Sequence, residues 1–113
     1  MSDKSGIPSA EALDISTLIA ITDDGIASRI LAKTAAANVT LFAFDRGQLL
    51  SEHVSPFEAL VVVIEGALNL TIAGSAVRAI PGTIVRMPAS VPHAVEALER
   101  SKMLLVMLRE PKS

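Results

Sequence analysis

Short apolar runs, each followed by turn-forming residues, repeat along the chain from about residue 28 to residue 108. The most pronounced is ALVVVI, residues 59–64, which ends at Glu65-Gly66. A run this short and this rich in β-branched residues predicts a buried strand and not a helix. The segment that leads into it carries a histidine, His53, and predicts another strand. The same pattern predicts further strands at residues 28–34, 39–44, 67–73, 76–80, 83–87, 93–98 and 102–108.

The connections between these runs contain the residues that favour tight turns. Asp45-Arg46-Gly47 and Pro81-Gly82 are the clearest examples. Some nine short strands at near-regular spacing predict an all-β sandwich or barrel. A parallel sheet is not expected, because parallel strands need a long crossover, usually a helix, between them.

The two ends of the chain differ from this strand-rich part. Residues 1–26 are expected to form an N-terminal arm with one short helical turn, capped by Asp14 and ended by a turn at residues 22–25. Residues 27–110 are expected to form the barrel domain, and residues 111–113 a tail.

Two of the predicted strands, residues 60–64 and 103–108, are apolar on both faces. One face of each strand can line the barrel, but the other then needs a cover, because exposed apolar surface is costly. A second copy of the chain is the simplest cover. The sequence therefore predicts a homodimer.

Composition narrows the possible partners and the compartment. The net charge of −2 and the pI near 5.6 provide no basic surface for nucleic acid or an anionic membrane. No apolar run is long enough for a transmembrane helix, and the first residues lack the apolar core of a signal peptide. The chain has no cysteine, which fits a reducing compartment, so a cytoplasmic protein is expected.

The chain contains only two histidines, His53 and His93, and each lies where a loop meets a predicted strand. Both are expected at the same mouth of the barrel with the same facing, so that their side chains meet inside it. They are the strongest candidates for chemistry, because no phosphate-binding loop, thiol pair or dinucleotide motif accompanies them.

The spacing around the histidines resembles the two sequence motifs of the cupins. Gly47, His53 and Gly66 match the first motif, and Gly82, Pro88 and His93 match the second, including the intervals from Gly47 to His53 and from Gly82 through Pro88 to His93. The resemblance covers almost the whole domain. It implies a double-stranded β-helix, the cupin jelly-roll barrel, of the small single-domain RmlC-like type.

The departures from the family pattern concern the metal ligands. Ser55 occupies the position of the second histidine and Ala59 that of the glutamate. Ser90 and Ala97 replace a glycine and an asparagine. Of the ligands that the resemblance implies, only two histidines are retained.

Two imidazoles are fewer ligands than catalytic zinc or iron sites usually have. Glu58 lies next to the glutamate position, but adjacent residues of a strand point to opposite faces, so it would need a reshaped turn at residues 55–57 to join them. The expected metal site therefore consists of His53 and His93 with water, and Glu58 is the candidate for a third ligand. Such a site would bind a divalent zinc, nickel, iron or manganese ion weakly. The alternative is two neutral histidines, hydrogen-bonded to each other, to Ser55 or to water.

The other residues expected around this pocket are mostly apolar: Ser55, Ala59, Val61 and Met87. Met87, Met103 and Met107 recur at strand spacing and are expected to fill the aliphatic core. Lys102 and Arg109, beside the last strand, are expected to be solvated.

Two functions remain open from the sequence. In the first, the barrel is a binding or sensing module for an unknown small molecule, and the histidines are the polar contact in an apolar pocket. In the second, suggested by the resemblance to the cupins, the protein is a metal-dependent enzyme of the dioxygenase or isomerase kind. The low ligand count favours the binding module.

Overall fold

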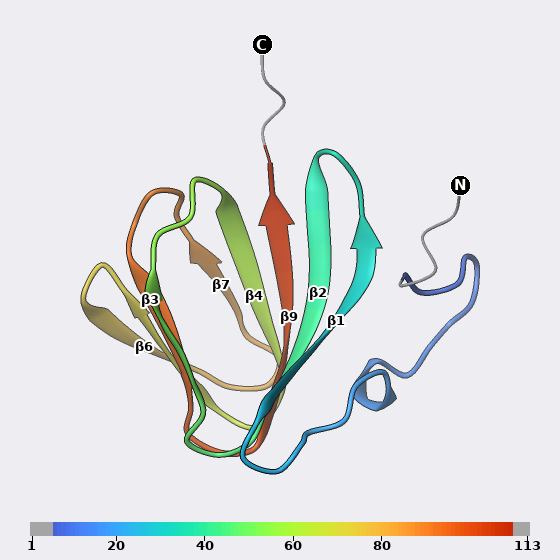
Figure 1. Ribbon diagram of the computed structural model, residues 1–113, viewed down its shortest axis with the longest axis horizontal. Helices are drawn as coiled ribbons and strands as arrows, with labels where there is room; N and C mark the ends of the chain where they lie inside the picture. The colour runs from blue at the N-terminus through green and yellow to red at the C-terminus, as the bar shows by residue number, and fades with distance from the viewer. Residues whose placement is uncertain (1–5, 110–113) are drawn as a thin grey trace.

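Nine strands make up almost all of the regular structure in residues 6–109, the part of the chain that the computed structural model describes (Figure 1). A short 3-10 turn, η1 (Ile15–Thr17), precedes them. The strands are β1 (Ile26–Lys33), β2 (Ala37–Phe44), β3 (Leu49–His53), β4 (Glu58–Glu65), β5 (Leu68–Ile72), β6 (Ser75–Ala79), β7 (Ile84–Met87), β8 (His93–Ala97) and β9 (Ser101–Leu108).

The strands form two antiparallel sheets that face each other. One sheet has five strands in the order β1-β2-β9-β4-β7, and the other has four in the order β3-β8-β5-β6. Figure 1 shows the two sheets converging at the lower end and diverging at the upper end, where β3, β4 and β9 each have one terminus. The all-β jelly-roll prediction is confirmed, and every predicted strand is present with its ends shifted by at most two residues.

The predicted helical turn is shorter than expected. The Asp14 side chain caps it by accepting a hydrogen bond from the Ser16 N–H at 3.1 Å, but the turn ends at Thr17 and contains no buried residue. In the described residues, no helix has the length and apolar character needed to cross a membrane. The first five residues of the predicted arm, and the predicted tail 111–113, lie outside the described residues.

The barrel core is built from one face of each strand. Along β4, Ala59, Val61 and Val63 are buried, whereas the intervening side chains are only half-buried in a single chain. In a single chain this strand is therefore buried on its inner face alone. The buried core residues around these three are Phe44, Leu68, Leu70, Ala79, Met87, Val95, Ala97 and Met103.

The narrow end of the barrel is closed by a tight turn between β4 and β5, where the chain passes from one sheet to the other. Ser101, fully buried at the start of β9, accepts a hydrogen bond from the Ala67 N–H at 3.1 Å and donates to the Glu99 carbonyl at 2.7 Å. Gly66 makes the turn possible, because it has a φ of +80° and a Cβ there would lie 2.3 Å from both the Arg100 carbonyl oxygen and Ser101 Oγ. Only glycine fits this position without displacing backbone.

The substitution Gly66→Ala tests this closure. It combines a left-handed backbone with a clash against the main chain, so it should lower the free energy of unfolding by about 3 kcal/mol or more. Gly74→Ala is the matched control, because Gly74 has a φ of +82° but open space around the added methyl group. The control should cost only about 1 kcal/mol for the backbone conformation. Equal losses in urea unfolding would show that the close contact at Gly66 is unimportant.

Candidate functional site

The two histidines meet at the open end of the barrel. His53 ends β3, His93 begins β8, and the two residues are direct partners in the antiparallel register. Their Nε2 atoms lie 3.0 Å apart, and the rings meet edge to face with centroids separated by 4.3 Å. The expectation that the two side chains approach each other inside the barrel is met.

Backbone carbonyls determine which nitrogen of each ring carries a proton. His53 Nδ1 lies 2.9 Å from the Ser51 carbonyl oxygen, and His93 Nδ1 lies 3.2 Å from that of Val91. A carbonyl oxygen only accepts hydrogen bonds, so each Nδ1 must be the donor. In the neutral rings both Nε2 atoms then carry lone pairs, so a direct hydrogen bond across the 3.0 Å between them requires a proton on one of the two. This arrangement is chemically compatible with a proton or a cation shared by the two nitrogens.

The surroundings of His93 favour its neutral form. Its side chain is 5% exposed, and burial lowers its pKa below the ordinary value, with a further lowering from the charge of His53. His53, by contrast, is exposed at the mouth. One ring is thus accessible from solvent, and the other is buried as a neutral acceptor or ligand.

A cavity of about 250 Å³ lies inside the barrel next to the histidine pair. Apart from His53 and His93, its lining is entirely apolar. The lining side chains come from both sheets: Phe42, Leu50, Met87, Val95, Met103, Leu105 and Met107. The site is thus an apolar chamber with a single polar centre.

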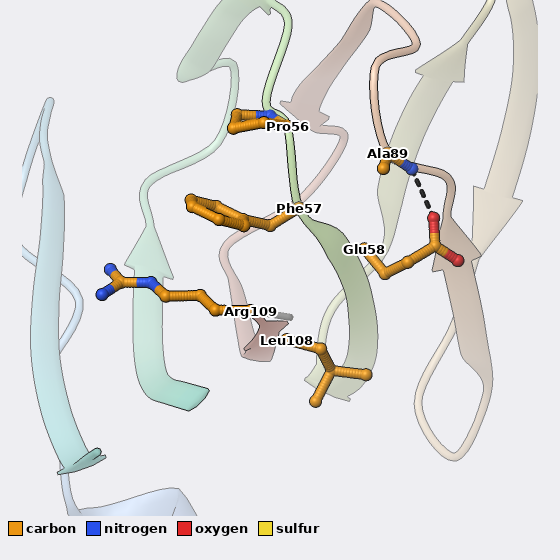
Figure 2. Close-up of a pocket in the computed structure, with 6 residues that line it drawn as sticks. All are labelled: Pro56, Phe57, Glu58, Ala89, Leu108 and Arg109. Atoms are coloured by element: carbon orange, nitrogen blue, oxygen red, sulfur yellow. Dashed lines mark hydrogen bonds between the residues drawn. The ribbon is translucent and has the colours of Figure 1, made fainter. Parts of the chain in front are cut away.

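Glu58, the possible third ligand, has other partners. Its carboxylate accepts hydrogen bonds from the Ala89 N–H, the contact drawn in Figure 2, and from Arg86 Nε at 2.6 Å. These bonds, that from Ala89 first, hold the pKa of Glu58 below its ordinary value. Within residues 6–109, no group of three or more histidine, cysteine, aspartate or glutamate side chains is placed to hold a metal ion. Although Glu58 lies next in sequence to the glutamate position of the family, adjacent side chains of β4 point to opposite faces, and Glu58 therefore does not join the histidines.

Of the other residues expected at the pocket, one lines the cavity and the rest lie in the core or in a neighbouring loop. Met87 lines the cavity, whereas Ala59 and Val61 are buried in the core. Ser55 has a structural role, since its Oγ accepts from the Phe57 N–H at 3.2 Å and its carbonyl accepts from the Ser90 N–H at 2.7 Å. The second of these bonds joins the two loops that lead to the histidines.

A second hollow, of about 390 Å³, lies beside the mouth (Figure 2). It is lined by Pro56, Phe57, Glu58, Ala89, Leu108 and Arg109. The Arg109 guanidinium lies over the Phe57 ring, 5.3 Å from its centroid, so the expectation of a solvated arginine is wrong. The same expectation is wrong for Lys102, which is largely buried, donates to the Ser16 carbonyl at 2.6 Å and lies 3.4 Å from Glu65. The apolar sequence of β9 did not indicate either contact.

Two antiparallel sheets closed at one end, with paired histidines at the open end, define a small jelly-roll barrel with an internal cavity. The profile of the cupin domain family matches residues 40–108, more than half of the chain. The chain therefore belongs to the cupin family.

Solved structures agree with this assignment. A conserved protein of unknown function from Streptococcus pyogenes superimposes with a TM-score of 0.91 and 34% identity, covering 99% of this chain and 98% of that one. A cupin superfamily protein from Desulfitobacterium hafniense follows at 0.87 and 25%, covering 93% and 96%. A cupin 2 conserved barrel domain protein from Leptotrichia buccalis gives 0.83 and 28%, covering 86% of this chain but 47% of that one. No functionally curated protein matches the sequence significantly.

The contacts of Glu58 predict a pH-dependent anchor for the loop before β8. Because the folded-state pKa is depressed, the carboxylate stabilises the fold above its unfolded value near 4.5, and this contribution is lost as the pH falls through the lower folded-state value. Glu58→Gln should remove that part of the acid dependence of the free energy of unfolding. Glu52→Gln, at an exposed position on β3, is the control and should retain it. Identical acid profiles for the two variants would contradict the assigned role.

Proposed function

We propose that this protein is a binding module that holds a small, largely apolar molecule in the barrel chamber, with His53 and His93 as its polar contact. The observation that carries the proposal is the lining of the 250 Å³ cavity, in which this pair is the one polar feature. Apolar walls with a few converging polar groups are typical of small-molecule sites. An apolar ligand with a single carboxylate or hydroxyl group best matches apolar walls with one polar pair.

The metal-dependent enzyme is the second candidate, and one observation favours it. Both Nε2 atoms converge with their lone pairs exposed, which suits a metal ion. Zinc and non-haem iron enzymes use at least one more protein ligand, and the described carboxylate nearest in sequence to the expected position, that of Glu58, is held by Arg86 and Ala89. A divalent ion held by two imidazoles and water would bind weakly, and we therefore place the enzyme second.

Hexanoate and its uncharged analogue hexanol are suitable probes of the chamber. Hexanoate should raise the thermal unfolding midpoint of the parent protein, because a ligand that binds only the folded state stabilises it. His93→Ala should abolish the shift, whereas Glu52→Ala, a control at an exposed position on β3, should keep it. A hexanoate shift that survives His93→Ala would place the ligand elsewhere.

Adding the missing ligands discriminates between the two candidates. Ala59 is buried with its side chain on the inner face, and the family pattern has a histidine and a glutamate where this chain has Ser55 and Ala59, so the double substitution Ser55→His with Ala59→Glu restores both donors. If the parent is a weak two-imidazole site, this variant should bind zinc tighter by orders of magnitude. A parent that already retains one equivalent of metal through dialysis against a chelator would instead favour the enzyme.

We further propose that the protein is a homodimer that buries the outer face of the five-stranded sheet. On β4 and β9, Leu60 pairs with Val106 and Val62 with Leu104, so these half-buried side chains form one continuous apolar surface. Exposed Ile84 on β7, next to Val62, extends it. A second copy of the same face would remove this surface from water, at about 25 cal/mol per Å² of apolar area.

A charge in the middle of that surface tests the dimer. Leu104→Lys should convert the protein to a monomer, because two lysines would meet near the dimer axis without partners. Val77→Lys, at an exposed position on the other sheet, should leave the dimer intact. Sedimentation at micromolar concentration distinguishes the two states, and a monomeric parent would contradict the proposal.

A further inference from the structure

The hollow beside the mouth of the barrel is lined by one anionic side chain, Glu58, and one cationic side chain, Arg109. Glu58 is bound by Arg86 and by the Ala89 N–H, whereas Arg109 forms no salt bridge within residues 6–109. Figure 2 shows the Glu58 carboxylate and the Arg109 guanidinium directed toward opposite sides of the hollow. The charge of Glu58 is thus already compensated, and that of Arg109 is left for an occupant.

The Arg109 guanidinium is stacked on an aromatic ring. Its central carbon lies 5.3 Å from the centroid of the Phe57 ring, a cation–π contact. The Nε atom is buried, and the part of the chain that the structure describes provides no hydrogen-bond partner for it. An unsatisfied buried donor is unfavourable, so an acceptor brought to this guanidinium would gain from its charge and from its unused hydrogen-bonding capacity.

Main-chain hydrogen bonds hold both members of this stack. The antiparallel register of β4 and β9, continued by one residue past its outermost pair at the open end, places Phe57 opposite Arg109. The Phe57 N–H donates to Ser55 Oγ at 3.2 Å, and the Arg109 N–H donates to the Ala36 carbonyl at 2.7 Å. The ring and the guanidinium are therefore ordered before a ligand arrives, which reduces the entropy lost on binding.

We propose that this hollow binds a small aromatic monocarboxylate, with the Arg109 guanidinium as the partner of the carboxylate group. A guanidinium presents pairs of N–H donors in one plane that match the two oxygens of a carboxylate, and stacking on Phe57 leaves the edge of that plane free. Pro56, Phe57 and Leu108 supply apolar lining, and an aromatic body packs better against such rings than a flexible chain does.

The size and position of the hollow agree with a small ligand of its own. Its volume of about 390 Å³ lies within the range of small-molecule sites, about 300–1,000 Å³. It shares no lining residue with the barrel cavity that contains the histidine pair. This site is therefore separate from the barrel cavity and does not depend on the function proposed for that cavity.

The charges of the lining favour a carboxylate over a phosphate. A phosphate monoester carries about 1.5 to 2 negative charges at neutral pH, whereas the hollow offers one guanidinium, that of Arg109. The second charge of a phosphate would lack a partner and would be repelled by Glu58 in the same lining. A monocarboxylate has no second charge.

Benzoate tests the site, with benzyl alcohol as its uncharged analogue and phenyl phosphate as its more highly charged one. In carbon–proton NMR spectra of the full chain, benzoate should shift the signals of Phe57, Leu108 and Ala89 and leave those of Met103 and His93 in place. Benzyl alcohol should bind about tenfold more weakly or less, because it lacks the charge-assisted hydrogen bonds. Phenyl phosphate should also bind more weakly than benzoate.

Substitutions of Arg109 test its role as the carboxylate partner. Arg109→Gln should weaken benzoate binding by about tenfold or more. Arg109→Lys should recover only part of the affinity, because lysine keeps the charge and loses the planar pair of donors. Arg78→Gln, at an exposed position on β6, is the matched control and should bind benzoate as the parent does. Unfolding midpoints show whether each variant remains folded.

The outcomes separate this site from the barrel cavity. Equal benzoate affinity in Arg109→Gln and the parent, or no binding by the parent at millimolar benzoate, would overturn the site. Benzoate shifts confined to Met103 and His93 would also overturn it and would place the ligand in the barrel cavity. Loss of benzoate binding in Arg109→Gln, with hexanoate stabilisation retained, would support two independent sites.

Discussion

The close packing at Gly66 and Ser101 is the constraint on which the rest of the barrel depends. Here the chain leaves one sheet and enters the other, and the Ser101 hydroxyl bonds to the Ala67 N–H and to the Glu99 carbonyl within a fully buried contact. This contact lies where the chain crosses from β4 in one sheet to β5 in the other. Because the sheets are fixed there and twist away from each other, the opposite end has room for a chamber instead of a filled core.

Hydrogen bonds join the loops at the open end. The Ser90 N–H donates to the Ser55 carbonyl, and the Ala89 N–H donates to Glu58, so the loop before β8 is attached at two points to the segment between β3 and β4. Ser90 has a left-handed backbone conformation, with a φ of 62°, where it makes this connection. The two histidines therefore face each other as a consequence of main-chain geometry.

The sequence was sufficient for the strands and for the meeting of the histidines. Apolar runs and turn residues define strands because their periodicity is local, and the alternation along β4 already placed Glu58 away from His53. That Met107 lines the cavity together with Met87 was not predictable. It depends on Ala59 facing Met87 and Met107 at once, and that register between distant strands is a property of the folded barrel. The contact of Arg109 with Phe57 was missed for the same reason.

The hydrogen bonds from the two Nδ1 atoms affect the rate at which a ligand of the histidine pair would exchange, as well as its affinity. Each imidazole is held by a carbonyl two residues earlier in its own chain segment, so neither ring can turn over without losing that bond. In the proposed binding site, the donor atoms of the two rings would therefore be oriented before a ligand enters. A flexible pair would lose rotational freedom on capture, whereas this one has lost it during folding. Its occupant should thus exchange at a rate set by access past exposed His53 and not by rearrangement of the donors.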